Sequence, residues 1–324
     1  MIILLKEIVT IPLKIFAPLL NRLLQKFNIF ILYTTRLSAG DHVCMSAVVR
    51  MIDEQYGFKI MVISAYPEIF ANNSRVWRSI SLKKSSPLAQ RIISFLLFGL
   101  RGTQIQRFLF FVGRYTLENY MRETKSQMHL VQVHSQHFRL PLNYKNLRPE
   151  IIFTNEEIVR YKTKFQLPPQ YAIIQPVGKT TYTPNKEWGF EKFQEVVNKL
   201  PQITWIQLGL AHDKLLDGVI DFRNKTKNLR EIFYVISKSS FLFVLEGLYN
   251  HIAAAFDIKS FVIFSGFHPF SIAKYTHTIP LLRIPPVECS PCWLLTPCPV
   301  KGKPCTEEIE VDYVVKTIFK NCSK

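Results

Sequence analysis

The chain lacks the sequence patterns that mark several common classes of protein. No uninterrupted apolar stretch reaches the ~18 residues that a membrane-spanning helix needs, so no such helix is expected. No dense basic run, zinc-finger pattern or RNP pattern is present, which leaves a basic nucleic-acid binder as a minor alternative, and we expect no nucleic-acid partner. No cleavable signal is evident, so the six cysteines are expected to be reduced thiols in the cytoplasm.

Two glycine-rich nucleotide-binding motifs are incomplete. The turn after the first predicted strand contains Gly40 but not a full G-x-G-x-x-G, so a dinucleotide-binding fingerprint is not supported. Gly178-Lys179-Thr180 matches the end of a P-loop, but position 173 is Ile where that motif needs its first glycine. We therefore reject a P-loop NTPase.

The chain does have a large excess of positive charge and enough length for two domains. It contains 41 Lys and Arg against 24 Asp and Glu, a formal net charge of +17 over 324 residues. Such a charge attracts an anionic partner, which could be a lipid surface, a phosphorylated substrate or nucleic acid, and charge alone does not choose among them. A chain of this length can bury two hydrophobic cores, so two α/β lobes are expected.

Residues 1–27 form an apolar segment that is interrupted by prolines and charges. Pro12 and Pro18 break the segment, and Arg22 and Lys26 are among the charged residues within it. The pattern predicts an amphipathic segment on an anionic membrane surface, with apolar side chains in the interface and cations facing the headgroups. The alternative is a helix packed on the protein's own core. The first interpretation predicts a cytoplasmic protein, peripheral on the inner face of the cytoplasmic membrane.

The first lobe is predicted to span residues 28–165. Strands at 28–33 and 59–64 flank a helix at 46–55, which is a βαβ opening. Asp41 follows the first strand, where a carboxylate of a doubly wound sheet faces the ligand cleft and could remove a proton from a hydroxyl; alternatively it caps the helix.

Residues 131–139 are predicted to be a strand that carries His134 and His137. These histidines suit a substrate-facing pair or part of a metal site, but no third ligand is evident, so surface or capping positions are the simpler interpretation. The proline-rich residues 140–169 predict the crossover between the lobes, with the boundary near residue 165.

The second lobe, residues 166–324, alternates strands with helices. The strands are predicted at 171–176, 204–208, 241–245 and 261–264, and the helices at 190–200, 228–237 and 250–256. This alternation predicts a parallel sheet, and ligands of such sheets bind at the carboxyl ends of the strands. Residues 246–251 lie at such an end, between a strand and a small-residue helix. They either contact a ligand or only cap the helix.

Four motifs, taken together, resemble glycosyltransferase family 9, the ADP-heptose:lipopolysaccharide heptosyltransferase family. They are R-L-S-A-G-D-H-V at 36–43, Q-P-V-G at 175–178 with N-K-E-W at 185–188, L-E-G-L-Y-N-H-I-A-A-A at 245–255, and C-S-P-C at 289–292 with two later cysteines. The resemblance covers residues 30–65 and 170–318. Three residues depart from the family pattern: Gln175 replaces His, Glu246 replaces Asp, and Leu248 replaces Gly.

The resemblance implies an α/β protein of the GT-B type, with two Rossmann-like lobes whose parallel sheets face a cleft. It implies an inverting transferase that moves heptose or a related sugar from a nucleotide-sugar to lipopolysaccharide or another cell-surface glycan, with the donor in the second lobe and the glycolipid or polysaccharide acceptor in the first. Asp41 is the implied catalytic base, and Arg36 and Ser38 are implied acceptor residues. The implied donor residues are Lys186, on phosphate, with Gly178, Glu246, Gly247, Asn250 and His251.

No cofactor is expected, because the chain has no D-x-D motif, in agreement with a metal-independent enzyme of this type. The last motif contains Cys289, Cys292, Cys298 and Cys305, which could bind Zn²⁺ or remain buried structural thiols; their spacing departs from that of ordinary zinc sites. The alternative to an enzyme is a non-catalytic relative that binds a glycan or a nucleotide.

Overall fold

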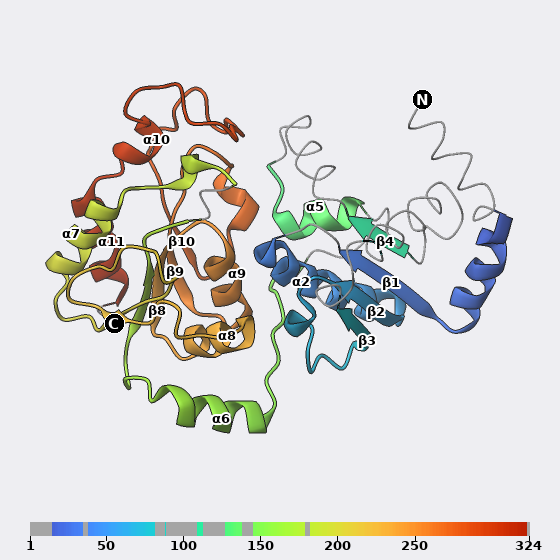
Figure 1. The fold of residues 1–324 in the computed structure, drawn as a ribbon. Helices are drawn as coiled ribbons and strands as arrows, with labels where there is room; N and C mark the ends of the chain where they lie inside the picture. The colour runs from blue at the N-terminus through green and yellow to red at the C-terminus, as the bar shows by residue number, and fades with distance from the viewer. Residues whose placement is uncertain are drawn as a thin grey trace. The chain divides into compact units, whose positions relative to one another are not determined.

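The computed structural model describes residues 15–34, 38–81, 88, 109–112, 127–137, 145–178 and 182–322. The chain divides into two compact units, which are drawn together in Figure 1. The first comprises Met1–Ser126 and Leu130–Phe153, and the second comprises Gln127–His129 and Thr154–Lys324. The division near residue 153 precedes helix α6 (Asn155–Phe165), at whose end the sequence predicted the boundary.

The described residues of the first unit form a four-stranded sheet in which every pairing is parallel. Its strands are β1 (Ile29–Thr34), β2 (Lys59–Ser64), β3 (Val76–Ser81) and β4 (Leu109–Val112), in the order β3-β2-β1-β4. Strand β1 lies inside the sheet, between β2 and β4, and its Phe30 and Leu32 are fully buried.

Helix α2 (Ala39–Tyr56) connects β1 to β2. The sequence predicted this helix only from residue 46; it begins seven residues earlier because Ser38 and Asp41 form a capping box at its start. The helix ends at Gly57, whose φ of 63° is left-handed and costs glycine little. Helix α5 (Leu130–His137) packs against α2. The predicted strand at 131–139 is therefore wrong.

The described residues of the second unit form a six-stranded parallel sheet in the order β10-β9-β8-β5-β6-β7. Its strands are β5 (Ala172–Gln175), β6 (Trp205–Gln207), β7 (Ile220–Asp221), β8 (Phe241–Leu245), β9 (Lys259–Ile263) and β10 (Thr278–Leu281). This strand order is that of a doubly wound, Rossmann-like sheet. From β5, successive strands are added toward one edge of the sheet, and from β8 they are added toward the other edge.

Helices pack around this sheet and bury an aromatic core. They are α6, α7 (Phe190–Lys199), α8 (Leu229–Ser237), α9 (Leu248–Ala255), α10 (Pro304–Glu307) and α11 (Val311–Cys322). Helix α7 contacts α11, and α8 contacts α9. Trp188, Phe193 and Phe243 are fully buried within ring-contact distance of one another, and the Trp188 indole N–H donates to the Ile309 carbonyl at 3.0 Å.

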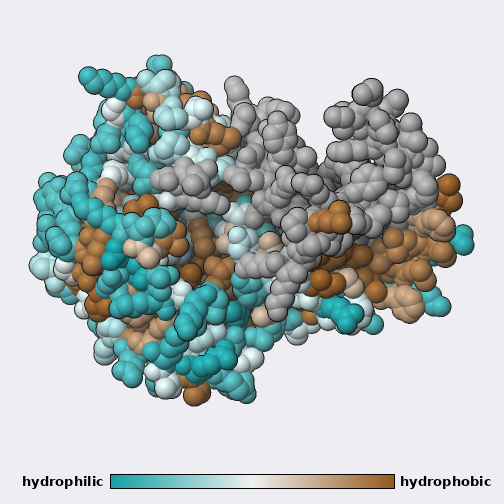
Figure 2. Space-filling view, viewed as in Figure 1, coloured by the Kyte–Doolittle hydropathy of each residue, from teal (hydrophilic) through white to brown (hydrophobic). Residues whose placement is uncertain are grey.

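Residues 15–26 form a helix that precedes β1, drawn in dark blue in Figure 1. It is anchored by Ala17 and Leu24, which are 3% and 6% exposed. Its other side carries exposed apolar residues, which give the brown patch over this helix in Figure 2: Ile15, Phe16, Leu19, Leu23 and the following Phe27. Within the described part of the chain, no helix is long and apolar enough to span a bilayer.

Candidate active site

Asp41 lies in the first turn of α2, directly after β1, and one of its oxygens belongs to a capping box. Its Oδ2 accepts hydrogen bonds from the Ser38 backbone N–H and the Ser38 hydroxyl, both at 2.8 Å. The Asp41 N–H donates to the Ser38 hydroxyl at 3.3 Å. The sequence left open whether Asp41 is a cap or a reactive group. Ser38 is the N-cap, Asp41 is its partner in the box, and Oδ1 remains for another contact.

His134, from helix α5, faces that other oxygen. Its Nε2 lies 3.7 Å from Asp41 Oδ1, and the side chains are 0% and 21% exposed, respectively. The sequence interpretation of His134 as a surface or capping residue is therefore wrong. Burial by itself raises the pKa of Asp41, but the nearby imidazole of His134 and the hydrogen bonds from Ser38 outweigh it and hold the pKa well below its usual range. Asp41 is thus ionised at neutral pH.

His42, the next residue, is buried and neutral. Its Nδ1 lies 2.8 Å from the Ser38 carbonyl, which can only accept, so Nδ1 carries the proton. Its Nε2, 2.7 Å from the Thr34 hydroxyl, accepts a hydrogen bond from it. Burial lowers the pKa of His42 to about 4. His42 therefore ties the end of β1 to the start of α2 and adds no charge beside Asp41 at neutral pH.

In the second unit, Lys186, Glu246 and His268 form a cluster. Lys186 Nζ makes an ion pair with Glu246 Oε2, and His268 Nδ1 lies 3.6 Å from the same oxygen. The three side chains are 18%, 10% and 11% exposed. Burial raises the pKa of Glu246, but the charge of Lys186 and the contact with His268 outweigh it, so the pKa lies below its usual range. Two predicted donor residues from separate motifs thus meet.

The cluster sits where a doubly wound sheet binds its ligands. Glu246 directly follows β8, His268 lies in the loop after β9, and Gly178 follows β5. These three strands are neighbours in one parallel sheet, so their carboxyl ends share an edge. Lys186 reaches this edge from the short helix η3 (Pro184–Lys186).

Aromatic rings hold the Lys186 side chain in place. Its Nζ lies 5.5 Å from the centre of the Tyr182 ring and 5.4 Å from that of Phe267. A cation beside ring faces is stabilised, and the apolar stem packs against them. The lysine is therefore fixed at this edge of the sheet before any ligand arrives.

The side chains of Asn250 and His251, two residues predicted at the donor, form hydrogen bonds within the second unit. Asn250 is fully buried; its amide donates to the Ala273 carbonyl at 2.6 Å, and its oxygen accepts from the hydroxyls of Ser260 and Thr278. His251 is 3% exposed, and its Nδ1 lies 2.8 Å from the Tyr275 hydroxyl. Both side chains are therefore buried and engaged in the packing of α9.

The two glycines predicted at the donor differ in their surroundings. The Gly178 N–H donates to Glu187 Oε1 at 2.8 Å, and a Cβ at Gly178 would lie 2.8 Å from the same oxygen. Gly178 therefore allows a close approach within the chain. Among the described residues, no atom beyond the local backbone and chain neighbours lies within 4 Å of the position of a Cβ added at Gly247, the N-cap of α9. The described part of the chain therefore leaves space beside this position, as a ligand there would require.

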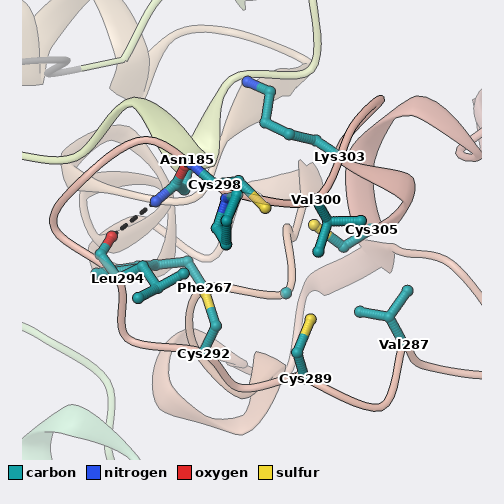
Figure 3. A pocket seen from close by; sticks show the side chains of 12 residues that line it. Asn185, Phe267, Val287, Cys289, Cys292, Leu294, Cys298, Val300, Lys303 and Cys305 are labelled. Carbon is teal, nitrogen blue, oxygen red and sulfur yellow. Dashed lines mark hydrogen bonds between the residues drawn. The ribbon is translucent and has the colours of Figure 1, made fainter.

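The four cysteines of the last motif line one cavity of about 60 Å³. Figure 3 shows Cys289, Cys292, Cys298 and Cys305 around this space, with Asn185 at its rim. Asn185 holds the loop: its amide donates to the Leu294 and Thr296 carbonyls, and its oxygen accepts from the Cys298 N–H.

Burial raises the pKa values of the Cys292 and Cys305 thiols. A raised thiol pKa favours the neutral thiol over the thiolate when no metal ion is bound. Across the described ranges, no three His, Cys, Asp or Glu side chains are arranged to hold a metal ion. The residues as placed therefore do not fit the Zn²⁺ site that the sequence left open.

Arg36, which the sequence predicted as an acceptor residue together with Ser38, lies outside the described residues.

Neither a family model nor a curated protein matches the chain, but solved structures do. A glycosyl transferase family 9 protein from Veillonella parvula matches with a TM-score of 0.57 and 13% identity, over 78% of this chain and 85% of that one. E. coli heptosyltransferase WaaC, solved with ADP-2-deoxy-2-fluoro heptose, matches with a TM-score of 0.56 and 14% identity, over 91% and 100%. The iron-containing dodecameric glycosyltransferase TibC from E. coli matches with a TM-score of 0.61 and 14% identity, over 91% and 76%.

The chain has the fold of the family 9 glycosyltransferases. The predicted GT-B class is therefore confirmed, with a parallel Rossmann-like sheet in each unit. Within this GT-B fold, Asp41 follows the inner strand β1 of the first sheet, and the Lys186–Glu246 pair lies at the carboxyl edge of the second.

Sequence reasoning placed neither histidine of these clusters correctly. His134 was considered for a substrate-facing pair or a metal site, but the alternation of its segment, Val131-Gln132-Val133-His134, predicted a strand and a surface or capping position. His268 was not considered, although it lies in the loop that follows the predicted strand at 261–264. Polar residues in such positions face the ligand edge of a parallel sheet.

Proposed function

We propose that the protein is an inverting, metal-independent glycosyltransferase of family 9. It moves heptose or a related sugar from a nucleotide-sugar to lipopolysaccharide or another cell-surface glycan. The observation that carries this proposal is the Lys186–Glu246 pair, buried at the ligand-binding edge of a GT-B second unit. The relatives that have this fold support the donor class, because TibC was solved with ADP-D-β-D-heptose and WaaC with ADP.

Lys186 and the start of α9 would receive the donor diphosphate. A departing diphosphate needs positive charge, which a lysine and the unpaired N–H groups of a helix N-terminus supply. Glu246 already holds Lys186 by its charge, and its carboxylate can in addition accept hydrogen bonds from donor hydroxyls. The open space beside Gly247 lets phosphate approach the backbone. His268, which shares Glu246, completes this donor set.

Asp41 would act as the general base on the acceptor. Its carboxylate takes the proton of the attacking hydroxyl while the hydroxyl oxygen bonds to the anomeric carbon. The bond from that carbon to the diphosphate oxygen breaks, and the diphosphate leaves with the electron pair. Attack from the face opposite the leaving group inverts the anomeric configuration. The charged state of Asp41 at neutral pH is the state that this role requires.

A membrane-bound glycolipid acceptor accounts for the surface of the helix at residues 15–26. Its outward apolar side chains, which include Leu19 and Leu23, lie beside the exposed Arg22 and Lys26. No helix of the described residues is long and apolar enough to cross a bilayer. Apolar side chains enter a lipid interface, and cations at its border contact anionic headgroups. We propose that this helix holds the protein on the inner face of the cytoplasmic membrane. Residues 1–14 lie outside the described residues.

A non-catalytic relative that binds a nucleotide or glycan is the second candidate. One observation favours it: both key side chains already have partners within the chain, since Asp41 completes a capping box and Lys186 is paired with Glu246. In that case the protein would bind a nucleotide-sugar without transferring its sugar.

The test of the proposed function is a thermal-shift panel with ADP-, UDP-, GDP- and CMP-sugars, because a ligand of the folded state alone raises the melting temperature. We expect one nucleotide class to raise it in the wild type and not in Lys186→Met. Lys214→Met, at a lysine that is 64% exposed, should behave as the wild type. Release of the nucleoside diphosphate in the presence of lipopolysaccharide then separates an enzyme from a binding protein. No shift with any donor would overturn both the transferase and the relative that binds a nucleotide.

A further inference from the structure

His134 is a fully buried histidine whose ring has no hydrogen-bond partner in the described part of the chain. Both Nδ1 and Nε2 lack one. A buried polar atom without a partner destabilises a protein, and most buried side-chain polar atoms have one, so an unsatisfied imidazole calls for an explanation. The carboxylate of Asp41 lies 3.7 Å away, beyond hydrogen-bond length and within ion-pair distance.

The two oxygens of Asp41 have different surroundings. Oδ2 accepts two hydrogen bonds from Ser38 and is thereby fixed to the backbone at the start of α2. Oδ1 faces His134. Since the Asp41 side chain keeps 21% of its surface exposed, the carboxylate is open to an incoming hydroxyl while its two oxygens are held by two different elements.

We propose that His134 is a positioning residue for Asp41: as its counter-ion, it fixes the Oδ1 oxygen and keeps the carboxylate charged for an acceptor hydroxyl. This role rests on the proposed function, in which Asp41 takes the hydroxyl proton. His134 itself gains and loses no atom in that step. It acts through charge and orientation, from a helix that packs on the helix carrying Asp41.

The other titratable groups around this pair act weakly. On α2, His42 is neutral at pH 7 because burial lowers its pKa to about 4, and its ring nitrogens are used by Thr34 and Ser38. On the short helix η1 (Pro67–Ile69), Glu68 acts on His42. Among the described residues, His134 is therefore the group whose charge bears most on Asp41, and its removal leaves only the Ser38 hydrogen bonds to oppose the effect of burial on the pKa of Asp41.

The experiment is a carboxyl NMR titration of the full chain labelled with ¹³C-aspartate, in which Asp41 is assigned by its absence from Asp41→Asn. In His134→Leu the pKa of Asp41 should rise by about 1–3 units, the effect of removing an opposite charge at this distance. His134→Gln keeps a polar side chain without charge and should give the same direction, so the test survives if the leucine variant does not fold. His212→Leu removes an exposed histidine 3.8 Å from Asp213 and should leave Asp41 unchanged. An Asp41 pKa that stays within about 0.3 unit of the wild type in both His134 variants overturns the proposal.

The second readout is transfer from ADP-heptose to lipopolysaccharide, followed as ADP release over pH. In the His134 variants, the pH below which the turnover rate falls should rise together with the pKa of Asp41. The KM for ADP-heptose should stay unchanged. A merely structural role would lower turnover at every pH without shifting the pH at which the rate falls, and that result contradicts the positioning role. A wild type that releases no ADP contradicts heptosyl transfer, and the titration then still decides whether His134 is the counter-ion of Asp41.

Discussion

Lys186 and Glu246 form a largely buried ion pair at the carboxyl edge of the second sheet, although they belong to different sequence motifs. This arrangement keeps the lysine in place without leaving a largely buried charge unpaired, which would destabilise the fold. In the function proposed above, donor phosphate must therefore compete with Glu246 or share Lys186 with it.

We expect Lys186→Met to weaken nucleotide-sugar binding by about 10- to 100-fold, since a hydrogen bond to a charged group is worth about 1.5–3 kcal/mol. The variant should also lower the free energy of unfolding by about 2–3 kcal/mol, below the 3–5 kcal/mol of a fully buried pair because both side chains keep some exposure. Calorimetric titration and urea unfolding measure the two effects.

The double variant Lys186→Met with Glu246→Gln separates the two roles of the pair. It removes both charges, so stability should return most of the way to the wild type while nucleotide-sugar binding stays weak. Recovery of binding together with stability would show that the lysine does not contact the donor.

Asp41→Asn should abolish transfer and leave nucleotide-sugar affinity nearly intact. The amide keeps the shape of the carboxylate but cannot take a proton from a hydroxyl, so the loss falls on turnover, about 100-fold or more. Diphosphate release and calorimetry measure turnover and affinity. Turnover near the wild-type level would remove Asp41 from the role of base.

Ser38→Ala tests the capping box apart from catalysis. Loss of the cap should cost about 1 kcal/mol of stability, within the range of about 0.5–2 kcal/mol for N-caps. Thr154→Ala removes the matching cap of α6, which has the same box with Glu157, and should cost a similar amount. A drop in turnover with Ser38→Ala but not with Thr154→Ala would show that the box also orients Asp41.

His42 should make stability fall as pH falls from about 6.5 to 4. Its folded pKa of about 4 lies below the ordinary value of 6.5, so the unfolded chain binds a proton in this window and the folded chain does not. The contribution of His42 to stability is therefore fully present above pH 6.5, and its loss on acidification is on the order of 3 kcal/mol.

In His42→Gln the slope of stability between pH 7 and 4 should flatten, as measured by urea unfolding at several pH values, while His277→Gln, at a half-exposed histidine, keeps the wild-type slope. Asp41 and Glu246 affect stability at lower pH than His42 does. Their folded pKa values lie below the ordinary values of 3.8 and 4.5. The stabilisation that they contribute is therefore present above those ordinary values and is lost as the pH falls through the folded pKa values. An unchanged slope in His42→Gln would mean that His42 is not held neutral.

The double variant Leu19→Glu with Leu23→Glu should reduce binding to vesicles that contain anionic phosphatidylglycerol by at least about tenfold. Each leucine contributes about 1.5–3 kcal/mol when its exposed surface enters an apolar phase. Sedimentation with vesicles measures the bound fraction. Val159→Glu, at an apolar residue of α6 that is 64% exposed, is the control.

The charges beside this face test the headgroup contact. Replacing Arg22 and Lys26 by Gln should weaken binding to anionic vesicles by about 1 kcal/mol for each charge removed. The weaker binding to neutral phosphatidylcholine vesicles should stay unchanged. Equal binding of the wild type to both vesicle types would contradict an anionic surface as the partner.

The second unit shows how far local pattern determines this fold. The short apolar runs at 241–245 and 261–264, with a small-residue helix between them, predicted β8, α9 and β9 with small errors in their ends. Fully buried parallel strands are continuous apolar runs, so local composition specifies them. The position of Glu246 after such a run was enough to predict its place at the ligand edge.

The first unit shows where local pattern fails. Residues 131–134 alternate like a strand, yet they form helix α5, because Leu130, Val131, Val133 and His134 are all buried when the segment is helical and packs on α2. For a segment this short, contacts with the rest of the fold outweigh its intrinsic preference.

By itself the sequence determined the α/β class, the two parallel sheets and the residues that follow their strands, because these depend on local periodicity and on the order of strands and helices along the chain. Only the tertiary structure decided that Lys186 meets Glu246, that His134 faces Asp41 and that Asn250 turns inward. Such contacts join residues far apart in the chain, and strand order and helix packing, which no local pattern encodes, bring them together.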